Sequence, residues 1–238
     1  MSTTVATPRG EVRTSRPVAL VTGASRGIGR AIAVALSPTH HVLVGGRNPD
    51  LVADVVASLE SADPFAVDLT DAAAVAGAVE GIGRLDVLVH SAGVVAFGAL
   101  ADSTTAQWRE ALELNVVAPA TLTRLLLPRL REAHGLVVFL NSGAGLTTHR
   151  GFSVYSASKY ALTAMADALR LDERGRVRVT SVHPGRVATD MQAQLSGLQG
   201  TPYVPDAHLD PAEVARAVRL AVDLPPDASL DSVRINPV

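Results

Sequence analysis

A glycine-rich turn between an apolar run and a helix-forming run lies near the beginning of the chain. The apolar run is residues 18–21, and the turn at residues 22–29 contains Gly23, Gly27 and Gly29. Gly23 permits a tight turn, Gly27 lets the backbone approach a phosphate, and Gly29 lets the helix pack closely on the strand. A pyrophosphate would then face the positive N-terminus of the helix. The spacing differs from G-x-G-x-x-G and would also suit a plain surface turn, but the flanking strand and helix favour a dinucleotide site.

Apolar runs alternate with helix-forming stretches along the whole body of the chain. We expect strands near residues 18–22, 41–45, 64–67, 86–90, 135–141, 177–182 and 232–236. Such alternation predicts a parallel sheet, with helices on both faces and the carboxyl ends of the strands gathered at one edge. The expected fold is therefore α/β, a Rossmann-like doubly wound, seven-stranded parallel sheet in a single domain over residues 16–238. Residues 1–15 are polar and lack the apolar core of a signal peptide, so we expect a flexible N-terminal leader.

Composition excludes several classes of function. The chain has 238 residues, 47% of them hydrophobic and 18% charged, which suits one α/β domain. It has no cysteine and its seven histidines form no ligand-like cluster, so no metal site is expected. A net charge of -2 without a basic tract argues against nucleic acid as a partner. No apolar run approaches the roughly 20 residues of a membrane span, so we expect no membrane partner and a cytoplasmic protein.

A tyrosine and a lysine four residues apart form a possible proton-transfer device. Tyr155 and Lys159 lie in a helix-forming stretch, which puts them one turn apart on one helix face. A phenol has an unperturbed pKa near ~10, and an adjacent ammonium should lower it toward a useful range. Ser142 follows an apolar run, so its hydroxyl should lie at the carboxyl edge of the sheet. An isolated Tyr-x-x-x-Lys also occurs by chance in many helices, so the pattern alone does not indicate catalysis. The glycine turn near the beginning of the chain is the second motif that supports this interpretation.

With these motifs in order, the chain resembles the short-chain dehydrogenase/reductase family, in its compact single-domain branch. The resemblance covers nearly everything from residue 16 to residue 238. It implies an NAD(P)-dependent oxidoreductase whose catalytic tetrad is Asn115, Ser142, Tyr155 and Lys159. The cofactor contacts that it implies, together with those expected from charge, are Gly23, Ser25, Arg26, Gly27, Ile28, Gly29, Arg47, Asp68, Leu69, Ser91, Ala92, Gly93, Tyr155, Lys159, Pro184, Gly185, Val187 and Thr189.

One motif departs from the family pattern. The family usually carries Asn-Asn-Ala-Gly after its fourth strand, whereas this chain has His90, Ser91, Ala92 and Gly93. The first Asn is expected to steady the central sheet through side-chain hydrogen bonds. Since a histidine ring has a different reach, we expect either some destabilisation or a compensating partner. Ala92 and Gly93 should still accommodate the cofactor ribose.

Charge at the end of the second strand favours NADP(H) over NAD(H). Residues 45 and 46 are glycines where an NAD-preferring fold would keep an acidic side chain, and Arg47 follows them. Arg26 in the glycine turn supplies a second cation, and both could hold a 2′-phosphate through charge-assisted hydrogen bonds. The alternative is that both are ordinary solvated surface arginines.

The resemblance implies a mechanism and leaves the substrate open. Hydride would pass between nicotinamide and a carbonyl carbon, while Tyr155 gives a proton to the oxygen and Ser142 holds that oxygen. Lys159 would lower the tyrosine pKa and bind the nicotinamide ribose, and Asn115 would anchor a water that links Lys159 to solvent. A lid at residues 189–205 and the apolar and polar residues near the cleft suggest a small or medium carbonyl or alcohol substrate.

Two other functions and an assembly are also possible. A catalytically silent nucleotide-binding regulatory protein could use the same scaffold, and an epimerase or dehydratase of the longer family branch is disfavoured by the glycine spacing. The family resemblance suggests a homo-oligomer, either a dimer or a homotetramer. Five apolar residues are candidates for its surface, although burial in the core explains them as well: Leu122, Leu125, Leu126, Leu162 and Met165.

Overall fold

The computed structural model describes residues 14–238 and contains one seven-stranded parallel sheet with the strand order β3-β2-β1-β4-β5-β6-β7. The strands are β1 (Val18–Val21), β2 (His41–Gly46), β3 (Ala62–Ala66), β4 (Val87–His90), β5 (Leu136–Leu140), β6 (Arg178–Pro184) and β7 (Ser232–Ile235). The predicted doubly wound fold is confirmed. Residues 1–13 of the expected leader lie outside the described residues.

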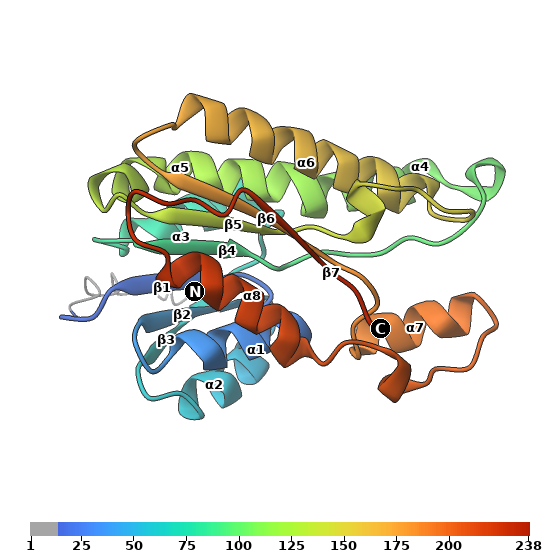
Figure 1. Ribbon diagram of the computed structural model, residues 1–238, viewed down its shortest axis with the longest axis horizontal. Coiled ribbons are helices and arrows are strands. Elements are labelled where there is room, and N and C mark those ends of the chain that lie inside the picture. The colour runs from blue at the N-terminus through green and yellow to red at the C-terminus, as the bar shows by residue number, and fades with distance from the viewer. Residues whose placement is uncertain (1–13) are drawn as a thin grey trace, which may run out of the picture.

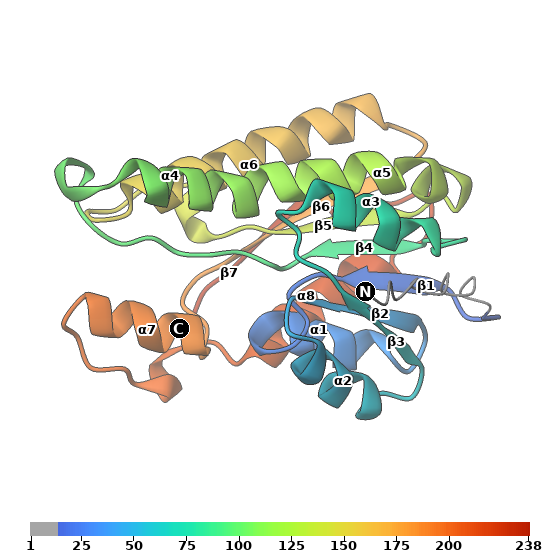
Figure 2. The same cartoon turned by 180° about the vertical axis from the view of Figure 1, so that it is seen from behind.

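Helices cover both faces of this sheet. They are α1 (Gly27–Leu36), α2 (Pro49–Ala57), α3 (Ala72–Glu80), α4 (Thr105–Leu112), α5 (Ala118–Glu132), α6 (Ser153–Asp172), α7 (Asp190–Leu198) and α8 (Pro211–Asp223). Short turns complete the list: 3-10 turns η1 (Leu100–Asp102), η3 (Gly143–Gly145) and η4 (Pro205–Ala207), and the π-helical η2 (Glu113–Val117). Figure 1 shows α5 and α6 on one side of the sheet and α1, α2 and α8 on the other, and Figure 2 shows α3 beside α5 from behind.

Two hydrophobic cores result, one on each face. Alternate residues of β1 point to opposite faces, so Ala19 and Val21 belong to the core under α1, α2 and α8, while Val18 and Leu20 belong to the core under α3, α5 and α6. This explains the unbroken apolar runs in the sequence, because a parallel sheet covered on both faces buries every side chain of its central strands.

The apolar residues proposed as an oligomer surface lie in or against the second core. Leu122 and Leu126 are 0% exposed and Leu162 is 2% exposed. Leu125 and Met165 are partly buried and pack against the same core. For Leu122, Leu126 and Leu162 the alternative of burial in the core holds, because they form the helix faces that cover the sheet. For the partly buried Leu125 and Met165 a place in an intersubunit surface stays a prediction.

The carboxyl ends of the strands lie at one edge of the sheet, the edge at which the sequence analysis expects the site. In both views α7 and η4 stand beyond this end on the side of α1 and α8, and the segment that leads into α4 stands beyond it on the side of α6 (Figures 1 and 2). The loops after β1, β2, β4, β5 and β6 therefore meet in the space that these two projections border.

Candidate active site

The glycine-rich turn after β1 closes against the loop after β4. Thr22 Oγ1 donates a hydrogen bond to the Val89 carbonyl oxygen at 3.3 Å, and it accepts the backbone N–H groups of Ser91 and Ala92 at 3.1 and 3.2 Å. Gly23 has a φ of +63°, and a Cβ there would lie 2.8 Å from the Ala92 backbone. Only glycine fits at this position, so the two loops meet backbone to backbone.

The first turn of α1 is open to an anion. Its N-cap residue, Arg26, makes no side-chain capping hydrogen bond, and no acidic residue lies in that turn. In contrast, Asn48 caps α2 and Asp71 caps α3 through their side-chain oxygens. A Cβ at Gly29 would collide with the Gly23 carbonyl oxygen, so the turn is as tight as a pyrophosphate cradle requires. Uncapped N–H groups at a positive helix end fit the phosphates of a dinucleotide.

The end of β2 has no room for an acidic side chain. A Cβ at Gly45 would lie 2.7 Å from the Val21 carbonyl oxygen, and one at Gly46 would lie 2.7 Å from Val52 Cγ2. Arg47 comes next and is exposed. The packing of the chain, in addition to the residue types, therefore keeps a carboxylate away from these two positions.

Asp68 and Arg26, two of the predicted cofactor residues, have partners within the protein. Asp68 Oδ1 accepts the N–H and the hydroxyl of Thr70 at 3.0 and 2.7 Å. These bonds hold the pKa of the Asp68 carboxyl below its ordinary value, and the charge of Arg47 lowers it further by a smaller amount. Arg26 Nη1 lies 3.8 Å from Asp190 Oδ2, with side chains 74% and 79% exposed. Arg26 thus connects the glycine turn to α7.

Four other predicted cofactor residues surround this loop system. Ile28 and Val187 pack against the core under α1 and α8, and Leu69 packs against the opposite core. The Ser25 hydroxyl lies 3.6 Å from the position of a Cβ at Gly46. Ser25 is therefore beside the end of β2, between the expected phosphate and ribose positions.

The segment after β6 returns to the glycine turn. Pro184 ends β6, and the N–H of Gly185 donates to the Ile235 carbonyl oxygen at 2.7 Å. Thr189 is the N-cap of α7, and its methyl carbon would lie 3.4 Å from a Cβ placed at Gly27. Thr189 therefore lies against the loop that is expected to hold the phosphates.

Tyr155 and Lys159 lie in the first two turns of α6, beside the end of β5. Lys159 is only 5% exposed, and its Nζ donates to the Leu140 carbonyl oxygen at 3.0 Å. The same Nζ lies 5.8 Å from the centroid of the Tyr155 ring. Tyr155 is partly buried, and the Ser142 hydroxyl is close enough to the phenol to lower its pKa through a hydrogen bond. The phenol, the alcohol and the amine therefore form one group.

Asn115 joins this group from the π-helical turn η2. Its Oδ1 accepts the Val94 N–H at 2.9 Å, and its Nδ2 donates to the Val94 carbonyl oxygen at 2.9 Å and to Ser158 Oγ at 3.0 Å. A Cβ added to Gly93 would lie 2.9 Å from Asn115 Oδ1 and 3.9 Å from Lys159 Nζ. Asn115 and Lys159 therefore both approach the side of Gly93 where a Cβ would lie, and the four residues predicted as a tetrad come to one place.

Protonation of Tyr155 differs from the expectation drawn from its spacing. Burial raises the pKa of the phenol above its ordinary value, and hydrogen bonding with Ser142 offsets this by a smaller amount. The expectation of a lowered pKa was wrong, because burial outweighs the neighbouring groups. Burial also lowers the pKa of the Lys159 ammonium to about 8. At neutral pH the phenol therefore keeps its proton and most of the Lys159 population is charged.

Two buried polar residues that the sequence analysis missed hold Ser142 in place. Asn141 Oδ1 accepts the Ser142 N–H at 2.9 Å, while Asn141 Nδ2 donates to Thr163 Oγ1 at 2.8 Å. His183 Nδ1 lies 3.1 Å from the Ser142 carbonyl oxygen, to which it donates. Asn141 and His183 are 6% and 1% exposed. Both stand at or near the carboxyl ends of apolar strands, a position that could have identified them from the sequence.

The departure at His90 has a compensating partner. His90 Nε2 lies 2.8 Å from Thr123 Oγ1 on α5, and the ring stacks on Phe139 with centroids 5.0 Å apart. The side chain is 2% exposed, and burial lowers the pKa of its imidazole to about 3, so the ring is neutral near pH 7. A neutral, stacked and hydrogen-bonded His90 connects β4 to α5, the structural role expected of the amide that it replaces.

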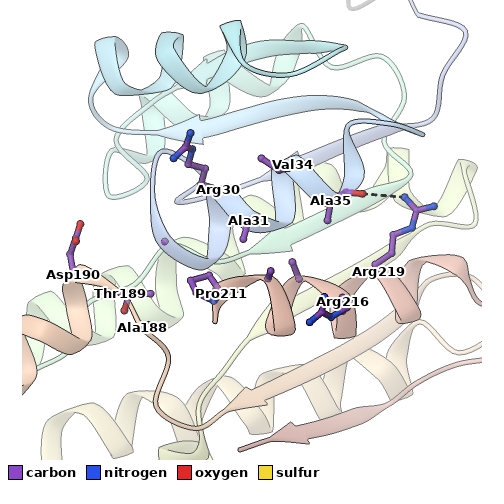
Figure 3. A pocket seen from close by; sticks show the side chains of 13 residues that line it. Arg30, Ala31, Val34, Ala35, Ala188, Thr189, Asp190, Pro211, Arg216 and Arg219 are labelled. Carbon is purple, nitrogen blue, oxygen red and sulfur yellow. Dashed lines mark hydrogen bonds between the residues drawn. The ribbon is translucent and has the colours of Figure 1, made fainter. Parts of the chain in front are cut away.

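A cavity of about 570 Å³ lies between α1 and α8 and reaches Gly27 and Thr189 at one end (Figure 3). Alanine side chains from both helices contribute to its lining, and Arg219, which donates to the Ala35 carbonyl oxygen at 3.3 Å, lies at the other end. No tetrad residue lines it. The cavity therefore adjoins the glycine turn that is expected to hold the phosphates, and it is separate from the predicted tetrad.

Residues 14–238 contain no group of three or more His, Cys, Asp or Glu side chains that could hold a metal ion. Within the same residues, none of the helices combines the length and the hydropathy needed to cross a membrane.

Similarity to known proteins points to the same family as the geometry of the site. A family model described as short chain dehydrogenase matches residues 17–199. The chain is 35% identical to an uncharacterized short-chain type dehydrogenase/reductase of Sinorhizobium fredii over 92% of this chain and 91% of that protein. It is 34% identical to glycine betaine reductase ATRR of Emericella nidulans over 97% of this chain, which spans only 19% of that longer protein.

Solved structures are similar over nearly the whole chain. An alcohol dehydrogenase of the archaeon Thermococcus sibiricus, complexed with 5-hydroxy-NADP, superposes with a TM-score of 0.85 at 26% identity, covering 94% of this chain and 97% of that one. A putative NAD(P)-dependent gluconate 5-dehydrogenase of Beutenbergia cavernae with bound NADP gives 0.83 at 29% identity, with 93% and 95% covered. The chain belongs to the short-chain dehydrogenase/reductase family and is an oxidoreductase of that family.

Proposed function

We propose that this protein is an NADP(H)-dependent oxidoreductase that transfers hydride between the nicotinamide and a small or medium carbonyl or alcohol substrate, with Tyr155 as the general acid and base. The proposal rests mainly on one observation: Asn115 Oδ1 and Lys159 Nζ converge on the same side of Gly93, while Tyr155 lies one turn before Lys159. A merely structural helix face would not need a lysine that is 95% removed from water.

When bound, the nicotinamide supplies or accepts the hydride. Tyr155, protonated at neutral pH because burial raises its pKa, gives its proton to the carbonyl oxygen during reduction. The Ser142 hydroxyl donates a second hydrogen bond to that oxygen, and the Asn141 and His183 contacts keep it in place. Lys159, oriented by the Leu140 carbonyl, stabilises the negative charge that Tyr155 acquires. Asn115 holds Val94 and Ser158, and we assign it a water that links Lys159 to solvent, through which a proton returns by way of Lys159 to Tyr155.

NADP(H) is preferred over NAD(H) in this proposal because of charge at the adenosine end. Gly45 and Gly46 leave no carboxylate to repel a 2′-phosphate, and Arg47 is exposed next to them. Arg26 would contribute a second cation by exchanging its Asp190 partner for the phosphate. Three of the similar solved proteins carry NADP or 5-hydroxy-NADP, which supports the same choice.

The conservative change Tyr155→Phe tests the assigned reaction. It keeps the packing of the ring and removes the acid, so kcat/KM for NADPH oxidation with a panel of ketones and aldehydes should fall by roughly 10²- to 10⁴-fold. NADPH binding, followed by fluorescence, should change little and reports that the site is intact. Retention of most of the turnover would refute the role of Tyr155. A wild-type protein that binds NADPH but reduces nothing in the panel would instead be a nucleotide-binding regulatory protein.

We also propose that the protein works in the cytoplasm as a homo-oligomer, a dimer or a tetramer. Because Leu122, Leu126 and Leu162 are buried, we look for such a surface among the exposed apolar residues. These include Leu112, which precedes η2 and is 37% exposed, and Val117, which ends η2 and is 45% exposed. Light scattering with Val117→Lys is the direct measurement, and a wild-type mass equal to one chain would contradict the assembly.

A further inference from the structure

The phenylalanines of this chain lie in two kinds of place, the hydrophobic core and the loops near the candidate active site. The sequence has four, and two of them, Phe65 and Phe139, are core residues at 4% and 0% exposure. The other two, Phe97 and Phe152, are only partly buried and lie in the loops after β4 and before α6. Both loops belong to the carboxyl end of the sheet, where the reaction takes place.

These two rings and the Tyr155 ring form a continuous aromatic row. The centroids of Phe97 and Phe152 are 5.3 Å apart with the planes at 71°, an edge-to-face contact. The centroids of Phe152 and Tyr155 are 6.3 Å apart with the planes at 56°. The row therefore extends directly from the phenol that gives up the proton, with geometries that aromatic pairs favour.

Backbone contacts hold this row in place. The Gly98 N–H donates to the Gly151 carbonyl oxygen at 2.9 Å, and Gly98 and Phe152 form an isolated parallel bridge. Gly151 has a φ of +81°, and a Cβ there would lie 2.5 Å from Phe97 Cε2. The Phe97 ring is thus seated directly on the Gly151 backbone. Rings held in this way lose little freedom when a ligand packs against them.

We propose that Phe97 and Phe152 form the wall that receives the substituent of the carbonyl carbon, and that the preferred substrates are aryl aldehydes and aryl ketones or the matching alcohols. The proposal rests on the proposed function, because it takes the substrate oxygen to be at Tyr155. A flat ring placed beside Tyr155 would extend the row by one more member, whereas a saturated ring of the same size gains burial alone.

The experiment compares benzaldehyde with cyclohexanecarbaldehyde, which are similar in size. The ratio of their kcat/KM values is measured for the wild type, Phe97→Leu, Phe152→Leu and the control Tyr160→Leu. Tyr160 is on the same helix, is 45% exposed and is outside the row. Because the ratio in each variant is divided by the wild-type ratio, differences in intrinsic reactivity cancel. We expect Phe152→Leu to lower the ratio about tenfold, Phe97→Leu by a smaller factor, and Tyr160→Leu not at all.

Binding gives a readout that does not depend on turnover. The dissociation constants of benzyl alcohol and cyclohexylmethanol for the NADP⁺-loaded protein are measured by calorimetry for the same four proteins. Ratios that stay at the wild-type value in both Phe variants would overturn the aromatic wall while leaving the reductase proposal standing. Loss of turnover in Tyr155→Phe with a Phe-dependent ratio supports both proposals. A Phe-dependent binding ratio in a protein that reduces neither aldehyde would overturn the proposed aryl carbonyl substrates, and the panel of ketones and aldehydes would then decide the reductase proposal separately.

Discussion

The proposed reaction end and the proposed adenosine end of the sheet edge are built differently. At the reaction end, Asn115, Asn141, Lys159 and His183 are each no more than 8% exposed and each is hydrogen-bonded to the backbone or to another side chain. At the adenosine end, Arg47 is exposed, and Arg26 has a partner only at 3.8 Å with a side chain that is 74% exposed. One end is fixed by buried contacts and the other presents solvated charge.

This difference separates two tasks. Proton transfer requires groups held in place before the substrate arrives, because a small displacement reduces the rate steeply. Recognition of a phosphate on a flexible cofactor can rely on long cationic side chains that adjust as it binds. We therefore expect changes at the reaction end to have large effects on turnover, and changes at the adenosine end to have moderate effects on cofactor preference.

The largest effect is expected for Lys159→Met. Loss of the charge next to Tyr155 should lower kcat/KM by about 10²- to 10⁴-fold. The protein should nevertheless become more stable near pH 7. Because burial lowers the pKa of Lys159 from 10.5 to about 8, the charged form is disfavoured in the folded state. A shift of this size corresponds to about 3 kcal/mol below pH 8. Denaturant unfolding of both proteins measures the gain, and a less stable Lys159→Met would contradict it.

The same shift predicts how wild-type stability depends on pH. Between about pH 8 and pH 10.5 the unfolded chain keeps the Lys159 proton and the folded protein does not, so this group makes stability rise with pH across that window. Over the same window carbonyl reduction should slow by about tenfold per unit, because Lys159 loses its charge. Comparing pH profiles of unfolding with those of Lys159→Met isolates this residue, and identical profiles would show that Lys159 is not the group responsible.

Most of the fold could be predicted from the sequence, because a sheet buried on both faces requires long apolar runs. The prediction was less accurate at the sheet edge. The strand expected at residues 64–67 is found at Ala62–Ala66, since Asp63 and Pro64 are poor strand formers that an exposed edge tolerates. The sequence also could not show what covers each apolar helix face. Periodicity indicates that Leu122 belongs to such a face, but not that the sheet buries it.

From the sequence, only those parts of the candidate site that belong to short motifs could be predicted. The glycine turn and the residues Ser142, Tyr155 and Lys159 were found by spacing. The raised pKa of Tyr155 was not, because burial depends on packing that spacing cannot show. Asn141 and His183 were missed for a related reason, since their contact with Ser142 brings together the ends of β5 and β6.

Removing the side chain that fixes Ser142 should have an intermediate effect. Asn141→Leu leaves the Ser142 N–H without its acceptor and Thr163 Oγ1 without one donor. Ser142 keeps its hydroxyl, so we expect a loss of about tenfold in kcat with a smaller change in KM, the pattern of a displaced group. Asn141→Asp, which keeps the acceptor, is the matched control and should restore much of the rate. Equal losses in both variants would show that packing, and not this hydrogen bond, is what matters.

The two arginines of the proposed adenosine end are separated by their effects on cofactor preference, and the smallest effect is expected for Arg26. Arg47→Asp places a carboxylate where a 2′-phosphate is expected, so the NADPH/NADH ratio of kcat/KM should fall by about ten- to a hundredfold. Arg26→Ala should lower the ratio only a few fold, because Arg26 already shares its charge with Asp190. A sharper test compares the effect of Asp190→Asn on NADPH affinity in the wild type with its effect in Arg26→Ala. If the Asp190 carboxylate competes with the phosphate for Arg26, then Asp190→Asn should raise NADPH affinity in the wild type and have no effect once Arg26 is alanine. An equal gain in both backgrounds would mean that Asp190 repels the cofactor directly, and the connection between the glycine turn and α7 would then play no part in cofactor choice.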